Sequence, residues 1–213
     1  MLVNKMNIIL IGIQGSGKGT QAKLLNEKYG WEHITTGDLF RRNIEAATEL
    51  GLAAKKFIDK GELVPDKYVF LIVKDALDKA VDGFILDGFP RNMEQVRFLQ
   101  ENFSIQRVVL LELPDNKAVE RLMARRNCAV CKRDYNILFK KPQKEGVCDV
   151  CGGELVIRDD DTEEAIRKRI EKFHNETNRV IEYYAEKGLL STVNADQPVE
   201  SIHNEIITKL GVE

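Results

Sequence analysis

A glycine-rich stretch near the start of the chain has the composition of a phosphate-binding loop. It runs from Gly12 to Thr20 and fits the pattern G-x-x-x-x-G-K, with Gly19 where a Ser or Thr usually holds Mg²⁺. An apolar run typical of a buried strand precedes it, and a segment with helical spacing follows it. Glycines let backbone N–H groups converge on an anion, the helix N-terminus adds partial positive charge, and Lys18 adds a full charge. We therefore expect the loop to bind the phosphates of a nucleotide, rather than to be only a tightly packed turn.

A second candidate site follows another apolar run, where the chain reads Asp87-Gly88-Phe89-Pro90-Arg91. A carboxylate at the end of a strand beside a phosphate-binding loop is well placed to hold hydrated Mg²⁺. Arg91 can bind a phosphate through its planar fork of N–H groups. Taken alone, the same five residues would also fit an ordinary turn.

The four cysteines form two C-x₂-C pairs, Cys128 with Cys131 and Cys148 with Cys151, separated by sixteen residues. This spacing is typical of a tetrahedral zinc site. The surrounding segment, of roughly 35 residues, is too small to hold a core unaided, so we expect a structural metal, with zinc favoured over iron. Disulfides and redox-active pairs are the alternatives, and a cytosolic setting disfavours structural disulfides. The histidines show no ligand spacing and are expected to be packing or surface residues: His33, His174 and His203.

Composition narrows the class of protein. Hydrophobic residues make up 43% of the chain and charged residues 31%, as in an ordinary globular protein. The formal net charge of −2 offers no basic surface for nucleic acid. The first residues lack the apolar core of a signal peptide, and no apolar run has the length of a membrane span. We expect a cytoplasmic protein without nucleic-acid or membrane partners.

Apolar runs alternate with amphipathic segments along most of the chain, which predicts an α/β fold with a parallel sheet covered on both faces. The expected strands are residues 7–11, 32–35, 83–86, 107–113 and 190–193. The expected helices are residues 18–29, 66–79, 93–102, 116–125, 163–186 and 199–210. Two segments interrupt the alternation: residues 36–64, mostly helical and named here the helical insertion, and residues 127–160, named here the cysteine module.

The helix expected at residues 163–186 has the clearest period. One stripe of it is mainly apolar: Ile166, Ile170, Phe173, Thr177, Val180 and Tyr184. We expect Asp161 as the N-cap of this helix, with Glu164 three residues later as in a capping box.

Taken together, the motifs resemble those of adenylate kinases, in order along essentially the whole chain. Besides the two segments above, the chain carries Thr35-Thr36-Gly37-Asp38-Leu39-Phe40-Arg41 and Gly61-Glu62-Leu63-Val64-Pro65-Asp66. The Gly19-Thr20 departure is itself the form that the loop takes in that family. The cysteine module resembles the long lid of the bacterial-type enzymes, in the version whose four cysteines bind zinc. Two positions depart from the family pattern: Gln14, where Pro is common, and Lys132, where Gly is more usual.

The resemblance implies a P-loop NTPase-like core with a five-stranded parallel sheet, formed by residues 1–35, 65–126 and 161–213. It implies an AMP-binding insertion at residues 36–64 and a zinc-binding lid at residues 127–160. The implied reaction is reversible phosphoryl transfer from MgATP to AMP, giving two ADP, in a monomer that serves adenine nucleotide homeostasis. ATP, AMP and ADP would then be the partners, and Zn²⁺ and Mg²⁺ the cofactors.

The resemblance also implies roles for matching residues. Those expected to hold ATP are Gly15, Ser16, Gly17, Lys18, Gly19, Thr20, Arg121, Arg125, Asp134, Tyr135 and Gln197, with Arg121 along the adenine. Those expected to hold AMP are Thr36, Arg41, Glu62, Leu63, Val64, Gly88, Phe89, Pro90, Arg91, Gln95, Arg158 and Arg169. Asp87 is expected to bind Mg²⁺ through water. The expected catalytic groups are Lys18, Arg91, Arg125, Arg158 and Arg169, since phosphoryl transfer needs aligned nucleotides and positive charge around the moving group.

Three alternatives remain open at this level. A kinase of the same fold could act on UMP or CMP, although the long lid and Gln95 favour AMP. GTP could replace ATP as the donor. A zinc-ribbon ATPase or switch would explain the glycine-rich loop and the cysteines, but not the segment from Asp87 to Arg91 or the helical insertion. AMP-dependent turnover distinguishes an enzyme from a switch or a purely structural protein.

Overall fold

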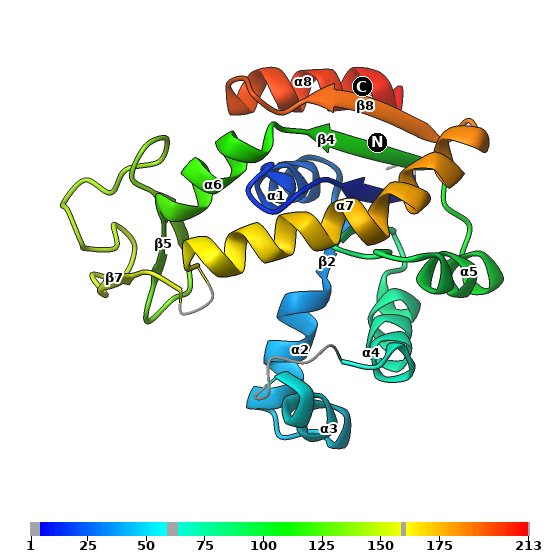
Figure 1. The fold of residues 1–213 in the computed structure, drawn as a ribbon, viewed down its shortest axis with the longest axis horizontal. Helices are drawn as coiled ribbons and strands as arrows, with labels where there is room; N and C mark the ends of the chain where they lie inside the picture. Colours follow the sequence, from blue (N-terminus) through cyan, green and yellow to red (C-terminus); the bar gives the residue numbers. More distant parts are fainter. Residues whose placement is uncertain (1–4, 59–63, 159–160, 213) are drawn as a thin grey trace.

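The centre of the molecule is a five-stranded parallel sheet with the strand order β2-β3-β1-β4-β8 (Figure 1). The computed structural model describes residues 5–58, 64–158 and 161–212. The strands of this sheet are β1 (Met6–Ile11), β2 (Glu32–Thr35), β3 (Gly83–Asp87), β4 (Arg107–Glu112) and β8 (Leu190–Asn194). The five expected strands are confirmed, with ends that differ by one residue at most.

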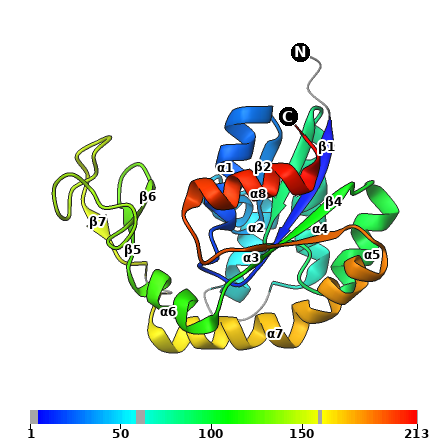
Figure 2. The ribbon, with the colours of Figure 1, turned by 90° about the horizontal axis from the view of Figure 1, so that it is seen from above.

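Helices cover both faces of this sheet, as expected. They are α1 (Lys18–Tyr29), α4 (Asp66–Lys79), α5 (Met93–Asn102), α6 (Asp115–Met123), α7 (Glu163–Glu186) and α8 (Val199–Leu210). Alternate side chains of β1 enter opposite clusters, because successive residues of a strand point to opposite faces. Ile8 and Leu10 pack with α1, α6 and α8, whereas Ile9 and Ile11 pack with α4 and α5. The long helix α7 crosses the molecule and contributes to both clusters (Figure 2).

The predicted stripe of α7 is confirmed, but its predicted N-cap is wrong. Thr162 is the N-cap, and its hydroxyl accepts a hydrogen bond from the Ala165 N–H at 3.3 Å. Asp161 turns instead toward two arginines, because a carboxylate gains more from charge-assisted hydrogen bonds than from a neutral N–H. Glu164 forms an i,i+4 pair with Lys168 and completes no capping box.

The helix expected at residues 116–125 was predicted to continue two residues beyond the end of the observed helix. α6 ends at Met123, where the Ala124 N–H closes the last turn on the carbonyl groups of Glu120 and Leu122. Arg125 begins strand β5 (Arg125–Cys128) and pairs with Asn136 of strand β6 (Asp134–Asn136). The antiparallel ladder therefore overrides the local helical pattern at this position.

The two interrupting segments stand apart from the main sheet. The helical insertion contains α2 (Thr36–Glu45) and α3 (Glu49–Ile58), which confirms its helical character. The cysteine module contains a second, antiparallel sheet with the order β6-β5-β7, where β7 is Leu155–Val156. It lies beyond the end of α6 and the start of α7, at one side of the main sheet (Figure 2). In the part of the chain that the structure describes, no helix combines the length and apolar character needed to cross a membrane.

Candidate active site and metal centre

The glycine-rich loop connects β1 to α1 and leads directly into the first turn of that helix. Gly15 and Gly17 have φ angles of 88° and 94°, in the region that favours glycine. A Cβ atom at Gly15 would also lie 3.1 Å from the Ala118 carbonyl oxygen. Gly17 is the N-cap of α1 and supplies no side-chain cap, so the first backbone N–H groups of the helix face the loop. This geometry suits an anion at the helix N-terminus.

Lys18 folds back over this loop. Its Nζ donates hydrogen bonds to the carbonyl oxygens of Gly12, at 2.7 Å, and Ile13, at 3.0 Å. Burial lowers the pKa of Lys18, the charge of Asp87 raises it, and the charges of Arg91 and Arg125 lower it further. Asp87, which is expected to bind Mg²⁺, therefore acts electrostatically on the Lys18 ammonium group, and so do Arg91 and Arg125, which are expected to be catalytic.

Asp87 ends β3, next to the end of β1 and of β2 in the sheet. Its side chain is 15% exposed, and its Oδ2 lies 3.4 Å from the Nε2 of His33. A partly exposed carboxylate beside the phosphate-binding loop fits hydrated Mg²⁺, which binds through one or two carboxylates and several waters. His33 has no motif around it, and only the pairing of β2 with β3 shows that it belongs to this neighbourhood.

Asp161 links two of the expected catalytic arginines. Its wholly buried carboxylate accepts two hydrogen bonds from Arg125, at 2.8 and 2.6 Å, and one from Arg169 at 2.9 Å. Desolvation lowers the pKa of Arg91, Asp87 and Glu176 raise it, and the charge of Arg169 lowers it further, so Arg91 and Arg169 act electrostatically on one another. The sequence did not single out Asp161 as a site residue, since an acid before a helix is also typical of a cap.

The segment after β3 carries a connected set of polar contacts. The Nε of Arg91 donates to the Gly88 carbonyl oxygen at 2.7 Å, and the Thr36 hydroxyl lies 3.4 Å from the same oxygen. Gln95 is buried, accepts from the Arg91 backbone N–H at 2.8 Å and donates to Asp66 at 2.7 Å. The structure thus brings together four of the residues expected to hold AMP, at the carboxyl edge of the sheet.

The other residues that are expected to hold AMP do not belong to this connected set of contacts. The exposed Arg41 pairs with Asp38 on the first turns of α2. Phe89 and Pro90 are buried and joined by a cis peptide bond, and Val64 is half-buried. Glu62 and Leu63 lie outside the described residues.

The side chain of Arg121, on α6, lies over the ring of Phe139 in the cysteine module, and we call this pair of side chains the shelf. The guanidinium carbon of Arg121 lies 5.3 Å from the ring centroid of Phe139, which is 65% exposed. Arg121 also approaches Asp196 at 3.4 Å, and its buried Nε has no hydrogen-bond partner among the described residues. Phe139 was not foreseen, although an exposed aromatic residue in a small polar module is a signal for a binding surface.

Asp134 and Gln197 form contacts within the protein. Asp134 accepts hydrogen bonds from Asn127, at 2.6 Å, and from Lys23 of α1, at 3.2 Å. Arg158, near the end of the cysteine module, donates to Asn127 at 2.6 Å and to Asp134 at 3.3 Å, so its side chain lies against its own module. Gln197 donates to the Asn194 carbonyl oxygen and to Glu205, both at 2.9 Å.

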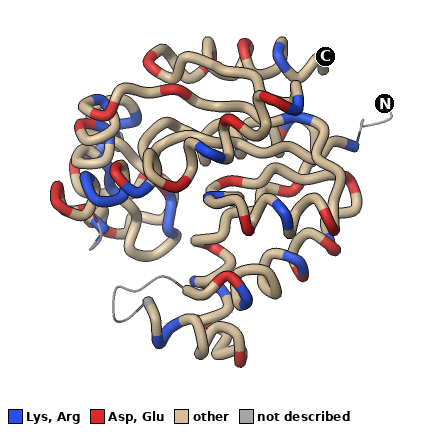
Figure 3. Tube along the Cα trace, turned by 45° about the vertical axis from the view of Figure 1, so that its right-hand side comes forward, with Lys and Arg blue, Asp and Glu red and all other residues tan. Residues whose placement is uncertain are grey.

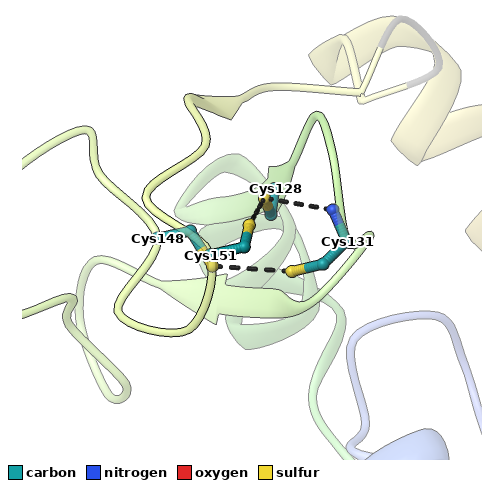
Figure 4. Close-up of side chains that lie close together, drawn as sticks. All are labelled: Cys128, Cys131, Cys148 and Cys151. Carbon is teal, nitrogen blue, oxygen red and sulfur yellow. Dashed lines mark hydrogen bonds between the residues drawn. The ribbon is translucent and has the colours of Figure 1, made fainter.

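The four cysteine sulfurs form one cluster, with every Sγ within 4.8 Å of the others (Figure 4). The Sγ atoms of Cys128 and Cys151 are 3.3 Å apart, and those of Cys131 and Cys148 are 3.6 Å apart. A tetrahedron with zinc–sulfur bonds of about 2.3 Å has edges of about 3.8 Å, so the sulfurs fit one tetrahedral metal ion. Apart from cysteines, the buried apolar cluster of the module contains only two side chains among the described residues, Tyr135 and Leu155.

The hydroxyl group of Tyr135 belongs to this cluster. It lies 3.4 Å from the Cys148 Sγ and accepts a hydrogen bond from the Asp149 N–H at 2.8 Å. The whole residue is only 3% exposed.

The backbone conformation of Lys132 shows why glycine suits the position after the first cysteine pair. Its φ angle is +58°, and its N–H donates to the Cys128 carbonyl oxygen at 3.1 Å. In the second pair Gly152 takes the same place, with φ +71° and a 2.9 Å bond to the Cys148 carbonyl oxygen. A lysine in this conformation carries a steric cost that glycine avoids.

Replacing Lys132 by glycine is therefore expected to stabilise the metal-loaded protein by about 1 kcal/mol. Differential scanning calorimetry at a fixed zinc concentration checks this. Arg133→Gly is the matched control: it removes the same charge at a neighbouring position without positive φ, and is expected to be slightly destabilising. Equal effects of the two variants would contradict the conformational explanation.

In the described part of the chain, acidic and basic residues are interspersed along the tube in the view of Figure 3. The positive charge relevant to a phosphate ligand is thus local: Lys18, Arg91, Arg125 and Arg169 adjoin the carboxylates of Asp87 and Asp161, and Glu176 also acts on Arg91. Such a local excess of positive charge favours a polyphosphate ligand.

Comparison with known proteins shows the family of this chain. The family model described as "Adenylate kinase" matches residues 10–189. An adenylate kinase of Caldicellulosiruptor saccharolyticus is 44% identical over 215 aligned residues, covering 98% of this chain and 100% of that protein. Adenylate kinases of Streptomyces avermitilis and Clostridium tetani are 46% and 45% identical, covering 92% and 97% of this chain and 93% and 99% of their own lengths. With its five-stranded core, its phosphate-binding loop and its cysteine cluster, the chain belongs to the adenylate kinase family of nucleotide phosphotransferases.

Proposed function

We propose that this enzyme transfers the terminal phosphoryl group of MgATP to AMP, reversibly, giving two ADP. The observation that carries the proposal is the local charge of the site, where four cationic side chains adjoin three carboxylates, Asp87, Asp161 and Glu176, near the glycine-rich loop and the segment Gly88–Arg91. Two nucleotides that meet there would bring several negative charges into this positive region. Charge stabilisation and alignment are the main requirements of phosphoryl transfer.

The donor phosphates are proposed to lie on the loop from Gly15 to Thr20, at the N-terminus of α1. Lys18 would leave the Gly12 and Ile13 carbonyl oxygens and bind the transferred group, and Arg125 and Arg169 would bind the phosphates from the side of α7. Mg²⁺, held through water by Asp87, would neutralise phosphate oxygens. The adenine is proposed to rest on the shelf that Arg121 forms with Phe139, because bases stack on arginine planes and aromatic rings. Asp134 and Gln197 would then lie near the donor nucleotide.

AMP is proposed to bind between the helical insertion and α5. Arg41 and Arg91 would hold its phosphate, and Thr36 and the backbone from Glu62 to Val64 would flank it. Gln95 would read the base, or position Arg91 for the phosphate, through its bond to the Arg91 N–H. Closure of the helical insertion over AMP and of the cysteine module over ATP, which would bring in Arg158, would exclude water that otherwise hydrolyses ATP.

The test is nucleotide analysis after mixing the protein with MgATP and, separately, AMP, CMP, UMP or GMP. Rapid ADP formation with AMP alone supports the proposal. Turnover with a pyrimidine monophosphate would retain the mechanism but change the acceptor, and faster turnover with MgGTP would change the donor. ATP binding without acceptor-dependent turnover would contradict the proposal.

We propose further that the four cysteines hold a structural Zn²⁺. The ion would join both C-x₂-C pairs and supply the stability that so small an apolar cluster lacks. Four thiolates leave no open coordination position, so the ion would take no part in the reaction.

Removal of this metal is expected to unfold the cysteine module before it affects the main sheet. A zinc-selective chelator that leaves Mg²⁺ in solution should raise hydrogen exchange within residues 127–158 and lower thermal stability, and turnover should fall only as the module unfolds. Hydrogen exchange followed by mass spectrometry, with turnover assayed in parallel, checks this. Chelator saturated with zinc is the control, and immediate loss of activity in a fully protected module would contradict a structural role.

A further inference from the structure

The hydroxyl group of Tyr135 can bond to both of its neighbours and also use its own proton in only one arrangement. It accepts the hydrogen bond of the Asp149 N–H at 2.8 Å, and an amide N–H has no other role than donor. Its own single proton is then left for the Cys148 Sγ, at 3.4 Å. The sulfur is therefore the acceptor of this contact.

An accepting sulfur is what a metal-bound thiolate offers. A coordinating cysteine is deprotonated and keeps electron density on its sulfur, which a hydrogen bond can stabilise. Cys148 and Tyr135 are both nearly fully buried, at 2% and 3% exposure, so no solvent competes at this contact. The contact also joins the two halves of the site, since Tyr135 lies on β6, between the cysteine pairs, and Asp149 lies inside the second pair.

We propose that Tyr135 is a positioning residue of the metal centre, whose hydroxyl donates a hydrogen bond to the Cys148 thiolate and strengthens the hold of the module on its metal. The inference rests on the proposed zinc site and assigns the side chain of Tyr135 to the metal instead of to the nucleotide. If Tyr135 only fills space in the apolar cluster, phenylalanine serves equally well.

Through Tyr135, the metal centre is also linked to residues that are proposed to lie near the phosphate donor, ATP. Asp134, the neighbour of Tyr135 on β6, is bonded to Lys23 of α1 and to Arg158. Fixing Tyr135 against Cys148 fixes the strand that carries this carboxylate. A metal without a place in the reaction thereby sets the position of residues beside the donor nucleotide.

The experiment compares the full-length protein with Tyr135→Phe and with a matched control, Tyr184→Phe. Tyr184 is 2% exposed and belongs to the core, and its hydroxyl has no hydrogen-bond partner among the described residues. Each protein is loaded with one equivalent of Zn²⁺ and titrated with a chromophoric chelator of known affinity. Each is then loaded with Co²⁺, whose thiolate-to-metal charge-transfer band reports the electron density on sulfur.

Tyr135→Phe is expected to hold zinc about 10- to 100-fold more weakly than the wild-type protein and to shift the cobalt charge-transfer band to lower energy. Tyr184→Phe is expected to match the wild-type protein in both measurements. Unchanged affinity and an unchanged band in Tyr135→Phe would overturn the inference while leaving the zinc site intact. A wild-type protein that fails to bind zinc or cobalt would overturn the metal proposal itself, and the inference with it.

A measurement on the unmutated protein covers the case in which Tyr135→Phe does not fold. With ¹¹³Cd²⁺ in place of zinc, the Tyr135 hydroxyl proton is expected to exchange slowly with solvent and to show scalar coupling to cadmium through the Cys148 sulfur. A hydroxyl proton that exchanges rapidly and shows no coupling would overturn the inference.

Discussion

Replacing Lys18 by methionine is expected to lower kcat by about 10³-fold or more, with a much smaller change in the KM for either nucleotide. Lys18 is the charge that the loop itself contributes, and it can move from the carbonyl oxygens of Gly12 and Ile13 to a phosphate. Removing one preorganised charge-stabilising donor from a phosphoryl-transfer or acyl-transfer site typically costs 10²- to 10³-fold or more. Steady-state kinetics in the direction of ADP formation measures the effect.

The fold should survive this substitution. Lys18→Met removes two hydrogen bonds from the ammonium group, but it also removes a buried charge that Arg91 and Arg125 repel. We expect the free energy of unfolding to change by less than about 1 kcal/mol. Lys28→Met is the matched control, because Lys28 is exposed in the last turn of the same helix. A Lys18→Met enzyme that keeps kcat within tenfold of the control would contradict the role given to Lys18.

Periodicity was sufficient to predict the core, for physical reasons that α7 illustrates. Its stripe repeats at helical spacing over 24 residues, and burial of the stripe on the sheet is the main source of its stability. The five strands are short apolar runs between such helices, which is the pattern that a parallel sheet requires. The cysteine cluster was predictable for a different reason, since two closely spaced pairs match the coordination of one ion.

The errors arose where tertiary contacts outweigh local preference. Arg125 has a helical neighbourhood in sequence, yet it pairs with Asn136 in an antiparallel ladder. Asp161 has the position of a cap, yet two guanidinium groups hold it. His33 lies beside Asp87 because β2 pairs with β3, which no local pattern reveals. Such residues become visible only when the sheet order is known.

The site residues taken from the family pattern stay predictions, and the structure makes them specific. It brings Lys18, Asp87 and the arginines within electrostatic reach of one another, and it gives Tyr135 a neighbour that the pattern did not suggest. Kinetic tests of these residues therefore need controls that separate charge from packing.

Asp161→Asn is expected to have two opposite effects on the same site. The buried carboxylate now balances Arg125 and Arg169 and holds both in fixed directions. Without its charge the two guanidinium groups repel each other, and one of the two acceptor oxygens is replaced by an NH₂ group that donates. We expect kcat to fall by about 10- to 100-fold. We expect the free energy of unfolding to fall by about 1–3 kcal/mol, less than for a fully buried pair because both arginines are about one-quarter exposed.

The binding of a simple anion should become tighter in the same variant. In the unliganded protein Asp161 competes with phosphate for Arg125 and Arg169, and the neutral amide competes less. Pyrophosphate is therefore expected to raise the Tm of Asp161→Asn by more than it raises the Tm of the wild-type protein, since a ligand stabilises in proportion to its affinity for the folded state. Glu164→Gln is the control, an acid on the same helix whose pair with Lys168 is exposed, and it should behave as wild type in both measurements. If pyrophosphate stabilises Asp161→Asn no more than wild type, the arginines do not receive the phosphates, and the loss of activity would have to be assigned to folding alone.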